Sequence, residues 1–276
     1  MGVKVGAQTG SKSAYVHNVY AVGRFFLERL VRPWLYPDFV YLLTQEGRTF
    51  RDHVKGIHAF TKGVIKERKA TKLLEQSVGG VDVKKRLAFL DLLLDEHLKN
   101  PQLLLEEDIR EEVDTFMFEG HDTTAMALSW TIFLLGHHPE AQRKCHEELD
   151  RIFNKGGQDD GDSDEDTRPA TVEDLRDMKY LECCIKEALR LYPSVPIVGR
   201  EVHTTFDVSQ RFALMEEKVV LSRLLRKFSI RSLCGIDRLE LSAEMVLRSR
   251  NGLPVTITRR PKGNGWSNKT TIDVLS

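Results

Sequence analysis

The residues best suited to chemistry form one short run, Glu119 to Thr124, with the sequence EGHDTT. Glycine, aspartate and paired threonines all disfavour a helix interior, yet this run lies inside a long apolar pattern with helical spacing. Glycine lets a flat ligand approach the backbone, and a threonine hydroxyl that bonds the carbonyl one turn earlier opens a groove that can hold water. The run therefore predicts a ligand-facing stretch of a buried helix. The simpler alternative is an irregular turn in that helix.

A second candidate is the pair Glu187 and Arg190. Three-residue spacing places the two charges on one face of a helix, where the guanidinium can make a fork-shaped contact with the carboxylate. Pairs of this kind are common on solvated helices, so a plain surface pair is the alternative interpretation.

The elements that must position these residues are mostly helices. Apolar residues recur at three- and four-residue steps along most of the first 153 residues. Proline at position 139 suits the first turn of a helix, where its missing donor costs nothing. The pattern predicts helices between 15 and 153, including a long one over 104–136, and then a loop rich in acidic residues over 155–168.

The second half of the chain adds a little β-structure to further helices. Thr171 and Asp174 fit a capping box that starts a set of helices over 171–192. An extended stretch over 195–208, a helix over 211–228 and a hairpin over 244–259 are expected to follow. Asn251 and Gly252 suit the two-residue turn of that hairpin. The predicted fold class is therefore mainly α with a small β component.

Composition narrows the function classes. The chain has 276 residues, 41% of them hydrophobic, which is enough to bury a substantial core. Lysine plus arginine and aspartate plus glutamate both number 41, so no charge surplus favours a nucleic acid as partner. The longest nearly apolar run, 125–135, is shorter than the roughly 20 residues of a transmembrane helix. The opening MGVKVGAQTG has no signal-peptide features, so we expect a start inside a larger protein's sequence.

Five segments then occur in one order: EGHDTT, HHPEAQ, YLECCIKEALRLYP, GRE and QRFALMEEKVVL. In order and approximate spacing they resemble a cytochrome P450, most closely the family-4 fatty-acid hydroxylases. The resemblance covers nearly the whole chain, although the chain is only about half of a full member. It implies an incomplete cytochrome P450-like helical core, which we expect to form a single partial domain over 1–276.

The resemblance also implies partners and a location. It implies haem as cofactor, a fatty acid or related lipid as substrate, and a reductase as electron donor. It further implies the cytoplasmic face of the endoplasmic reticulum membrane. Because we find no anchor in this sequence, we expect the chain itself to be soluble and intracellular.

Individual residues match the family's functional positions. Asp122 and Thr123 resemble the pair that delivers protons to iron-bound dioxygen, a role that needs an exchangeable hydroxyl beside a carboxylate. Glu119 resembles the glutamate that esterifies the haem, and Arg200 resembles the arginine that binds a haem propionate. Glu187 with its partner three residues later resembles the buried ion pair that holds the region near the haem.

One part of the family pattern is missing. The family places its iron-binding cysteine just before QRFALMEEK, where this chain has Asp207, and the F-x-x-G-x-R-x-C-x-G loop is absent. Both flanks match the family, so we predict an internal deletion with its joint near 207–210. No cysteine is expected to ligate a metal, since Cys145, Cys183, Cys184 and Cys234 lie at other family positions and are expected to behave as small buried hydrophobes.

Three hypotheses remain open at this point. In the first hypothesis, the chain is an oxidoreductase of the monooxygenase type that is catalytically impaired. It lacks the cysteine segment that would supply the thiolate ligand, which promotes O–O cleavage. Alternatively, it is a non-catalytic truncated isoform or fragment that acts as a binding protein, or the product of a faulty gene model. An unrelated helical scaffold is the third hypothesis, and five ordered motifs argue against it.

Overall fold

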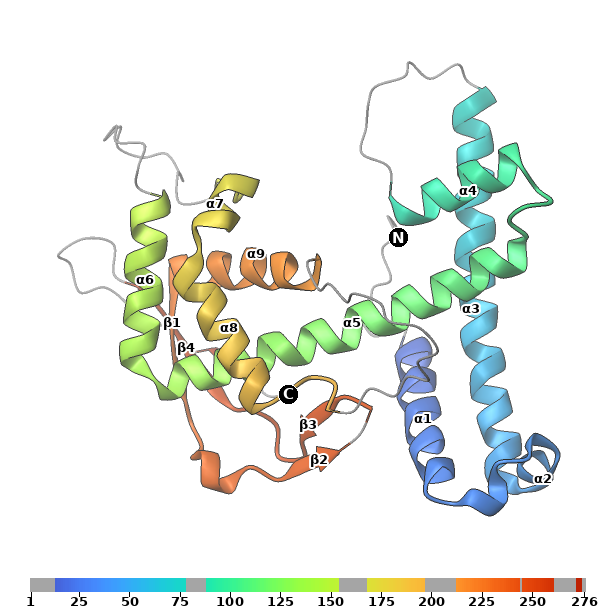
Figure 1. Ribbon diagram of the computed structural model, residues 1–276, viewed down its shortest axis with the longest axis horizontal. Helices are drawn as coiled ribbons and strands as arrows, with labels where there is room; N and C mark the ends of the chain where they lie inside the picture. The colour runs from blue at the N-terminus through green and yellow to red at the C-terminus, as the bar shows by residue number, and fades with distance from the viewer. Residues whose placement is uncertain are drawn as a thin grey trace, which may run out of the picture. The chain divides into compact units, whose positions relative to one another are not determined.

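The computed structural model describes residues 13–77, 88–153, 168–196, 212–243, 245–260 and 272–274. Their elements are mostly helices with a few short strands (Figure 1), which confirms the predicted fold class. The helices are α1 (Ser13–Leu30), η1 (Pro33–Leu35), α2 (Asp38–Leu43), α3 (Gln45–Ser77), α4 (Phe89–Lys99), α5 (Glu106–His137), α6 (Pro139–Phe153), α7 (Val172–Asp177), α8 (Lys179–Leu191), α9 (Phe212–Lys227) and η3 (Ile236–Arg238). The strands are β1 (Phe228–Ser232), β2 (Leu241–Ala243), β3 (Leu247–Ser249), β4 (Val255–Arg259) and β5 (Ile272–Val274).

The chain gathers into two compact units, Met1–Gly120 and His121–Ser276, and the division falls inside α5. That helix runs without a break through the EGHDTT motif, which confirms the predicted long helix. The single partial domain expected from the sequence stays a prediction. Nearly all of the expected acidic loop over 155–168 and the joint near 207–210 lie outside the described residues, as does Arg200. No helix in the described ranges has both the length and the apolar character needed to cross a membrane.

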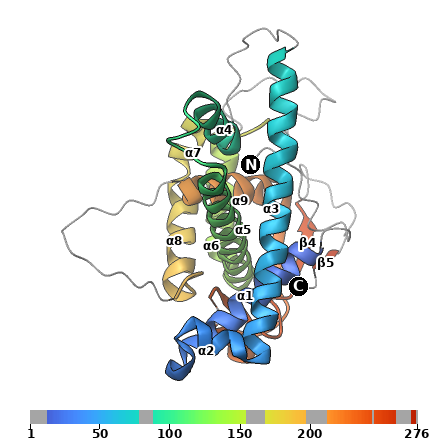
Figure 2. The same ribbon diagram turned by 90° about the vertical axis from the view of Figure 1, so that its right-hand side faces the viewer.

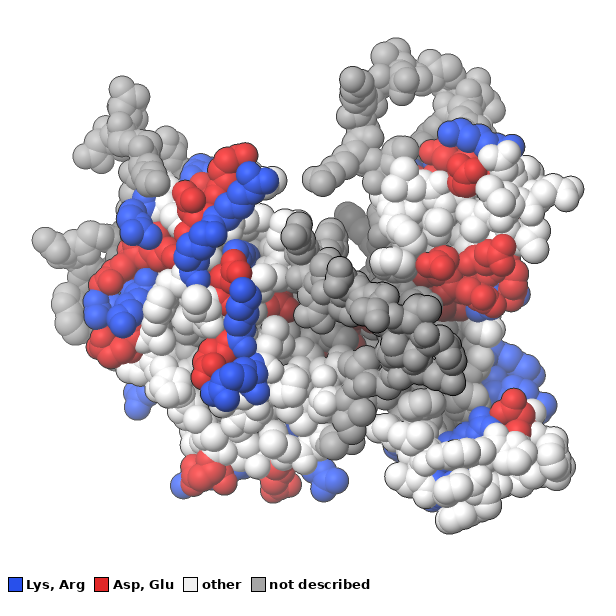
Figure 3. Space-filling model, viewed as in Figure 1, with Lys and Arg blue, Asp and Glu red and all other residues white. Residues whose placement is uncertain are grey.

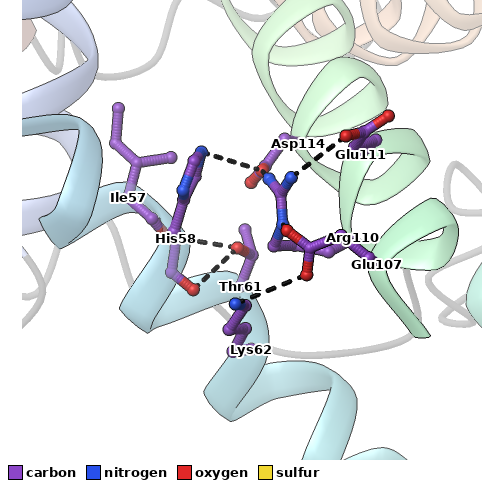
Figure 4. A network of polar contacts seen from close by, with 8 residues as sticks. All are labelled: Ile57, His58, Thr61, Lys62, Glu107, Arg110, Glu111 and Asp114. Atoms are coloured by element: carbon purple, nitrogen blue, oxygen red, sulfur yellow. Dashed lines mark hydrogen bonds and ion pairs between the residues drawn. The ribbon is translucent and has the colours of Figure 1, made fainter.

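The first unit contains a small apolar core where α3, α4 and α5 meet. Its fully buried side chains include Leu90, Leu94, Ile109 and Val113. Beside this core, a polar network joins α3 to α5 (Figure 4), and the Arg110 side chain at its centre is only 8% exposed.

The network is built around one arginine of α5. Arg110 Nε donates to Glu107 Oε1 at 2.8 Å, and its Nη1 is paired with the carboxylate of Asp114. From α3, His58 Nε2 lies 3.7 Å from Asp114 Oδ2, and Lys62 Nζ lies 3.4 Å from Glu107 Oε2. Ion pairs with spacings of three and four residues thus continue into contacts between the two helices.

The second unit has the larger core, where α5, α6, α8, α9 and strand β1 meet. Trp130, Phe133, Leu149, Leu181 and Leu221 are fully buried in it. The core places α5 against β1 so closely that a Cβ added at Gly136 would lie 2.5 Å from Ser232 Oγ, a distance that only glycine tolerates here.

Buried polar side chains fix the register of these elements. On α6, Gln142 Nε2 donates to Ile230 O at 2.8 Å, and Ile230 N donates to Gln142 Oε1 at 2.8 Å, so the amide pairs with β1 as a neighbouring strand would. Glu148 of the same helix accepts from Tyr180 N at 2.7 Å and from Leu181 N at 2.9 Å. These are amides of the first turn of α8, which otherwise have no partner within that helix.

The capping box of α7 is present as predicted. Thr171 Oγ1 accepts from Asp174 N at 3.2 Å, and Asp174 Oδ2 accepts from Thr171 N at 2.8 Å. The Arg168 guanidinium hydrogen-bonds the same carboxylate and lowers the pKa of Asp174 to about 2. The cap is therefore ionised at any neutral or mildly acidic pH.

The predicted hairpin over 244–259 is wrong. Gly252 does adopt the positive φ of a turn, at 71°, but the two strands beside it belong to different sheets. β3 pairs antiparallel with β2, while β4 lies between β1 and β5. The expected helix over 211–228 ends at Lys227, and β1 then provides five residues of register for β4. This long-range pairing replaces the local one.

Candidate functional site

The acid of the EGHDTT motif is held by an arginine from far along the chain. Asp122 is 8% exposed on α5, and its carboxylate is paired with the guanidinium of Arg248 on β3. A second nitrogen of this arginine, Nη1, lies 3.6 Å from Met126 Sδ, one turn further along α5. The arginine therefore lies along the surface of the helix and neutralises its one buried carboxylate.

An aromatic anchor brings β3 to this position. Trp130 Nε1 donates to Leu247 O at 3.1 Å, and the indole stacks on Tyr192 with centroids 4.3 Å apart and planes 6° from parallel. Leu247 N in turn donates to Ser194 O at 2.8 Å, just after the end of α8. Because both backbone groups of Leu247 are bonded, the next residue, Arg248, has its direction set by two other elements.

The hydroxyl of the motif lies beside the acid in sequence but not on the same face. Thr123 is half-buried, and consecutive residues of a helix do not face each other. Further along α5, Ser129 Oγ and Thr131 Oγ1 each donate at 2.8 Å to the carbonyl four residues earlier, the arrangement that lets hydroxyls lie in a helix interior. The pairing of Asp122 and Thr123 in proton delivery stays a prediction.

Two positions of the motif belong to the first unit. The Glu119 side chain is exposed on α5. A Cβ added at Gly120 would meet no described atom within 4 Å, so no described neighbour requires glycine there. The approach of a flat ligand to the backbone at this glycine stays a prediction.

The second candidate pair forms and is exposed. Arg190 donates to both oxygens of Glu187 at 2.8 Å, and the two side chains are 67% and 56% exposed. The hydrogen bond from Arg190 lowers the pKa of Glu187. Among the described residues, the pair therefore looks like an ordinary surface pair, and its role near a haem stays a prediction.

All four cysteines lie in described parts of the chain. Cys145 is fully buried on α6, and its sulfur lies 3.7 Å from that of Cys184 on α8. The hydrogen bond with Cys184 is the main cause that raises the pKa of the Cys145 thiol, and burial raises it further. Cys183 is exposed and Cys234 is half-buried. Nowhere in the described ranges do three or more histidine, cysteine or acidic side chains gather as a metal site would need.

Sequence reasoning missed Arg248 as the partner of Asp122. It lies at an alternating position of a short strand, which indicates only which way its side chain points. The two residues are 126 positions apart, and no local spacing rule connects them.

The profile of the family Cytochrome P450 matches residues 1–210. Cytochrome P450 4c3 of Drosophila melanogaster is 37% identical over 332 residues, and Cytochrome P450 4V2 of Homo sapiens is 36% identical over 326 residues. Both alignments cover 94% of this chain and 60% of the relative. Cytochrome P450 4A6 of Oryctolagus cuniculus is 40% identical over 192 residues, which cover 70% of this chain and 36% of the relative.

The alignments include more positions of the relatives than of this chain. The chain spans 60% of the length of the first two relatives. The alignment with the Drosophila protein extends over 332 residues, but the 94% of this 276-residue chain that takes part amounts to about 259. About 70 aligned positions of that relative therefore have no counterpart in this chain.

Proposed function

Because the chain belongs to the cytochrome P450 family, we propose that it derives from a monooxygenase of fatty acids or related lipids and now binds such ligands without activating oxygen. The curated relatives are family-4 members, which supports the lipid class. The observation that carries the proposal is the placement of the four cysteines. By the family resemblance, none of them stands at the position of the axial thiolate, which falls on Asp207 in this chain.

The donor set does not fit a haem-thiolate centre. Haem with a cysteine thiolate supplies the electron donation that favours O–O cleavage. Here Cys145 is buried against Cys184 with a raised pKa, which keeps it a thiol. Cys183 lies on the exposed side of α8, and Cys234 follows β1. On this proposal the chain supports no step of oxygen activation at a haem.

We also propose that the cysteine loop was lost by an internal deletion near 207–210. The family profile stops matching at Gln210, and the alignments with the Drosophila and human relatives include more positions of those proteins than of this chain. Both observations support a clean joint within one polypeptide. On this proposal the described residues form part of a single partial domain.

We propose that the site residues occupy the same positions as in other family members but no longer perform the same functions. Asp122 keeps its place on α5 and is held by Arg248, so its carboxylate contributes to packing of β3. Thr123 and Arg200 are proposed to mark the former dioxygen and propionate positions. Glu119 is proposed to remain unesterified, since ester formation in the family depends on turnover. The reductase and the endoplasmic reticulum membrane are proposals for the full-length form.

A haem titration with a matched control tests the proposal. The purified chain is incubated with haem, reduced under carbon monoxide and scanned, and is then denatured to ask whether haem stays attached. We expect no thiolate-type Soret band and fully extractable haem. The control is a chain with an F-x-x-G-x-R-x-C-x-G segment inserted before Gln210. A thiolate-type band in the uninserted chain would overturn the proposal.

Ligand binding is measured separately. Displacement of a fluorescent fatty acid should occur with a long-chain fatty acid and not with a short-chain carboxylate of equal charge. If no displacement occurs while the circular dichroism spectrum still shows intact helices, the proposed lipid binding is wrong. The proposed loss of oxygen activation would not be affected by that result.

A further inference from the structure

Two helices of the second unit bring a pair of thiols into contact. α6 and α8 run side by side (Figure 2). Cys145 Sγ on α6 lies 3.7 Å from Cys184 Sγ on α8, which is ordinary van der Waals contact for two sulfur atoms. Cys145 is fully buried, and Cys184 is partly exposed.

Other contacts fix this proximity independently of the cysteine side chains. Glu148 of α6 binds the backbone amides of Tyr180 and Leu181 of α8. Cys145 lies three residues before Glu148, and Cys184 lies three to four residues after those amides. In two antiparallel helices these steps lead one turn along the same interface from the first contact. The register set by the carboxylate therefore also aligns the two sulfurs.

We propose that Cys145 and Cys184 are a modification site that forms a reversible disulfide when the protein meets a peroxide. A disulfide needs its sulfurs about 2.05 Å apart, so about 1.7 Å must be closed. The proposed movement is a rotation about χ1 of one or both cysteines, the torsion that carries each sulfur.

The chemistry balances with one peroxide per pair. Cys184 reacts first, because this residue is partly exposed whereas Cys145 is fully buried, and the hydrogen bond from Cys145 lowers the pKa of Cys184. Its thiolate forms an S–O bond with one peroxide oxygen while the O–O bond breaks, and hydroxide leaves and takes up the thiol proton as water. Cys145 Sγ then attacks the sulfenic sulfur, an S–S bond forms, and the S–O bond breaks. The oxygen leaves as a second water with the Cys145 proton.

The other pairings are geometrically poorer. Cys183 precedes Cys184 on the same helix, and consecutive helical side chains point in different directions. It is exposed, whereas Cys145 lies inside the core. The proposed bond would close a loop between positions 39 residues apart and tie α6 to α8, so oxidation should stabilise the second unit by restricting its unfolded state.

The test uses the full chain, reduced and then treated with hydrogen peroxide at neutral pH. We expect the number of free thiols to fall from four to two and a Cys145–Cys184 cross-linked peptide to appear by mass spectrometry. The melting temperature should rise by several degrees, and dithiothreitol should reverse the rise.

Matched variants keep the proposal falsifiable. Cys183→Ser with Cys234→Ser leaves only the proposed pair and should form the bond as fast as the parent chain. Cys145→Ala should abolish it, and the same oxidation in urea should lose its preference for this pair. The proposal is overturned if the native chain gives a bond through Cys183 or Cys234, or a sulfinic acid at Cys184 beside a free Cys145.

Discussion

Two arginines of this chain have the same local pattern and opposite surroundings. Arg110 in the first unit and Arg143 in the second each have an acid three residues earlier and another four residues later. The Arg110 side chain is 8% exposed, and its acidic partners also contact α3. The Arg143 side chain is 54% exposed, and its ion pairs with described residues lie within α6. The two arginines have identical spacing to their acidic partners in the sequence. Burial alone distinguishes the structural network of Arg110 from the surface ion pairs of Arg143.

The same contrast extends to the two units. The second unit closes its core around large apolar side chains, and charged residues of both signs cover its outer helices (Figure 3). The first unit has a smaller core and leaves large apolar side chains exposed around α2, where Val31, Phe39 and Leu43 are each more than 70% exposed. Charged contacts between α3 and α5 therefore carry more of the first unit's stability.

The largest expected effect lies in the core of the second unit. Trp130→Ala removes a fully buried indole together with its bond to Leu247 and its stack on Tyr192. Loss of a buried aromatic costs about 3–5 kcal/mol. Hydrogen exchange should speed up in α6 and α8, and urea unfolding gives the magnitude. Trp130→Phe is the control and should recover much of the loss; equal losses in the two variants would contradict the packing argument.

A matched pair of arginine substitutions tests the contrast directly. Arg110→Met leaves Asp114 without its partner beside the core of the first unit, and breaking a buried pair costs about 3 kcal/mol. Arg143→Met removes an equally spaced arginine from a solvated face and should leave the unfolding midpoint unchanged. Urea denaturation of both variants at equal ionic strength is the measurement. Equal effects would show that burial does not distinguish the two networks.

Some features of the fold could be predicted from the sequence and others could not, depending on how far apart in the chain the contacting residues lie. Periodicity predicted α5 and α6, and the capping residues Thr171 and Asp174 predicted the start of α7, because these signals act within a few residues. The pairing of β4 with β1 and the bond between Asp122 and Arg248 depend on residues far apart, so local pattern could not find them. The hairpin prediction failed for the same reason, although its turn at Gly252 is real.

A buried carboxyl of the second unit should make its stability depend on pH. Burial raises the pKa of Glu217 from 4.5 to about 7. Below pH 4.5 the carboxyl is protonated in both states and has no effect. As the pH rises from 4.5 through 7, the unfolded chain ionises first and stability falls, by about 3 kcal/mol in total. Glu217→Gln should remove this fall, so the variant gains over the parent at pH 8 and not at pH 4. A parallel pH profile for both chains would count against it.

The smallest expected effect concerns the pair that the family resemblance makes most prominent. Glu187 and Arg190 are more than half exposed, so Arg190→Ala should leave the melting temperature unchanged at physiological salt. Lys218→Met is the matched comparison. Lys218 is a buried lysine of α9 that donates to Leu175 O at 2.9 Å and to Glu182, an acid on the helix α8 that also carries the exposed pair. Its removal takes the buried donor from Leu175 O and leaves Glu182 with Lys186 alone, and it should lower the melting temperature by several degrees. If Arg190→Ala instead matches the loss from Lys218→Met, the guanidinium must have a third partner among residues 197–211, and the pair would then act as the buried network of an intact family member does.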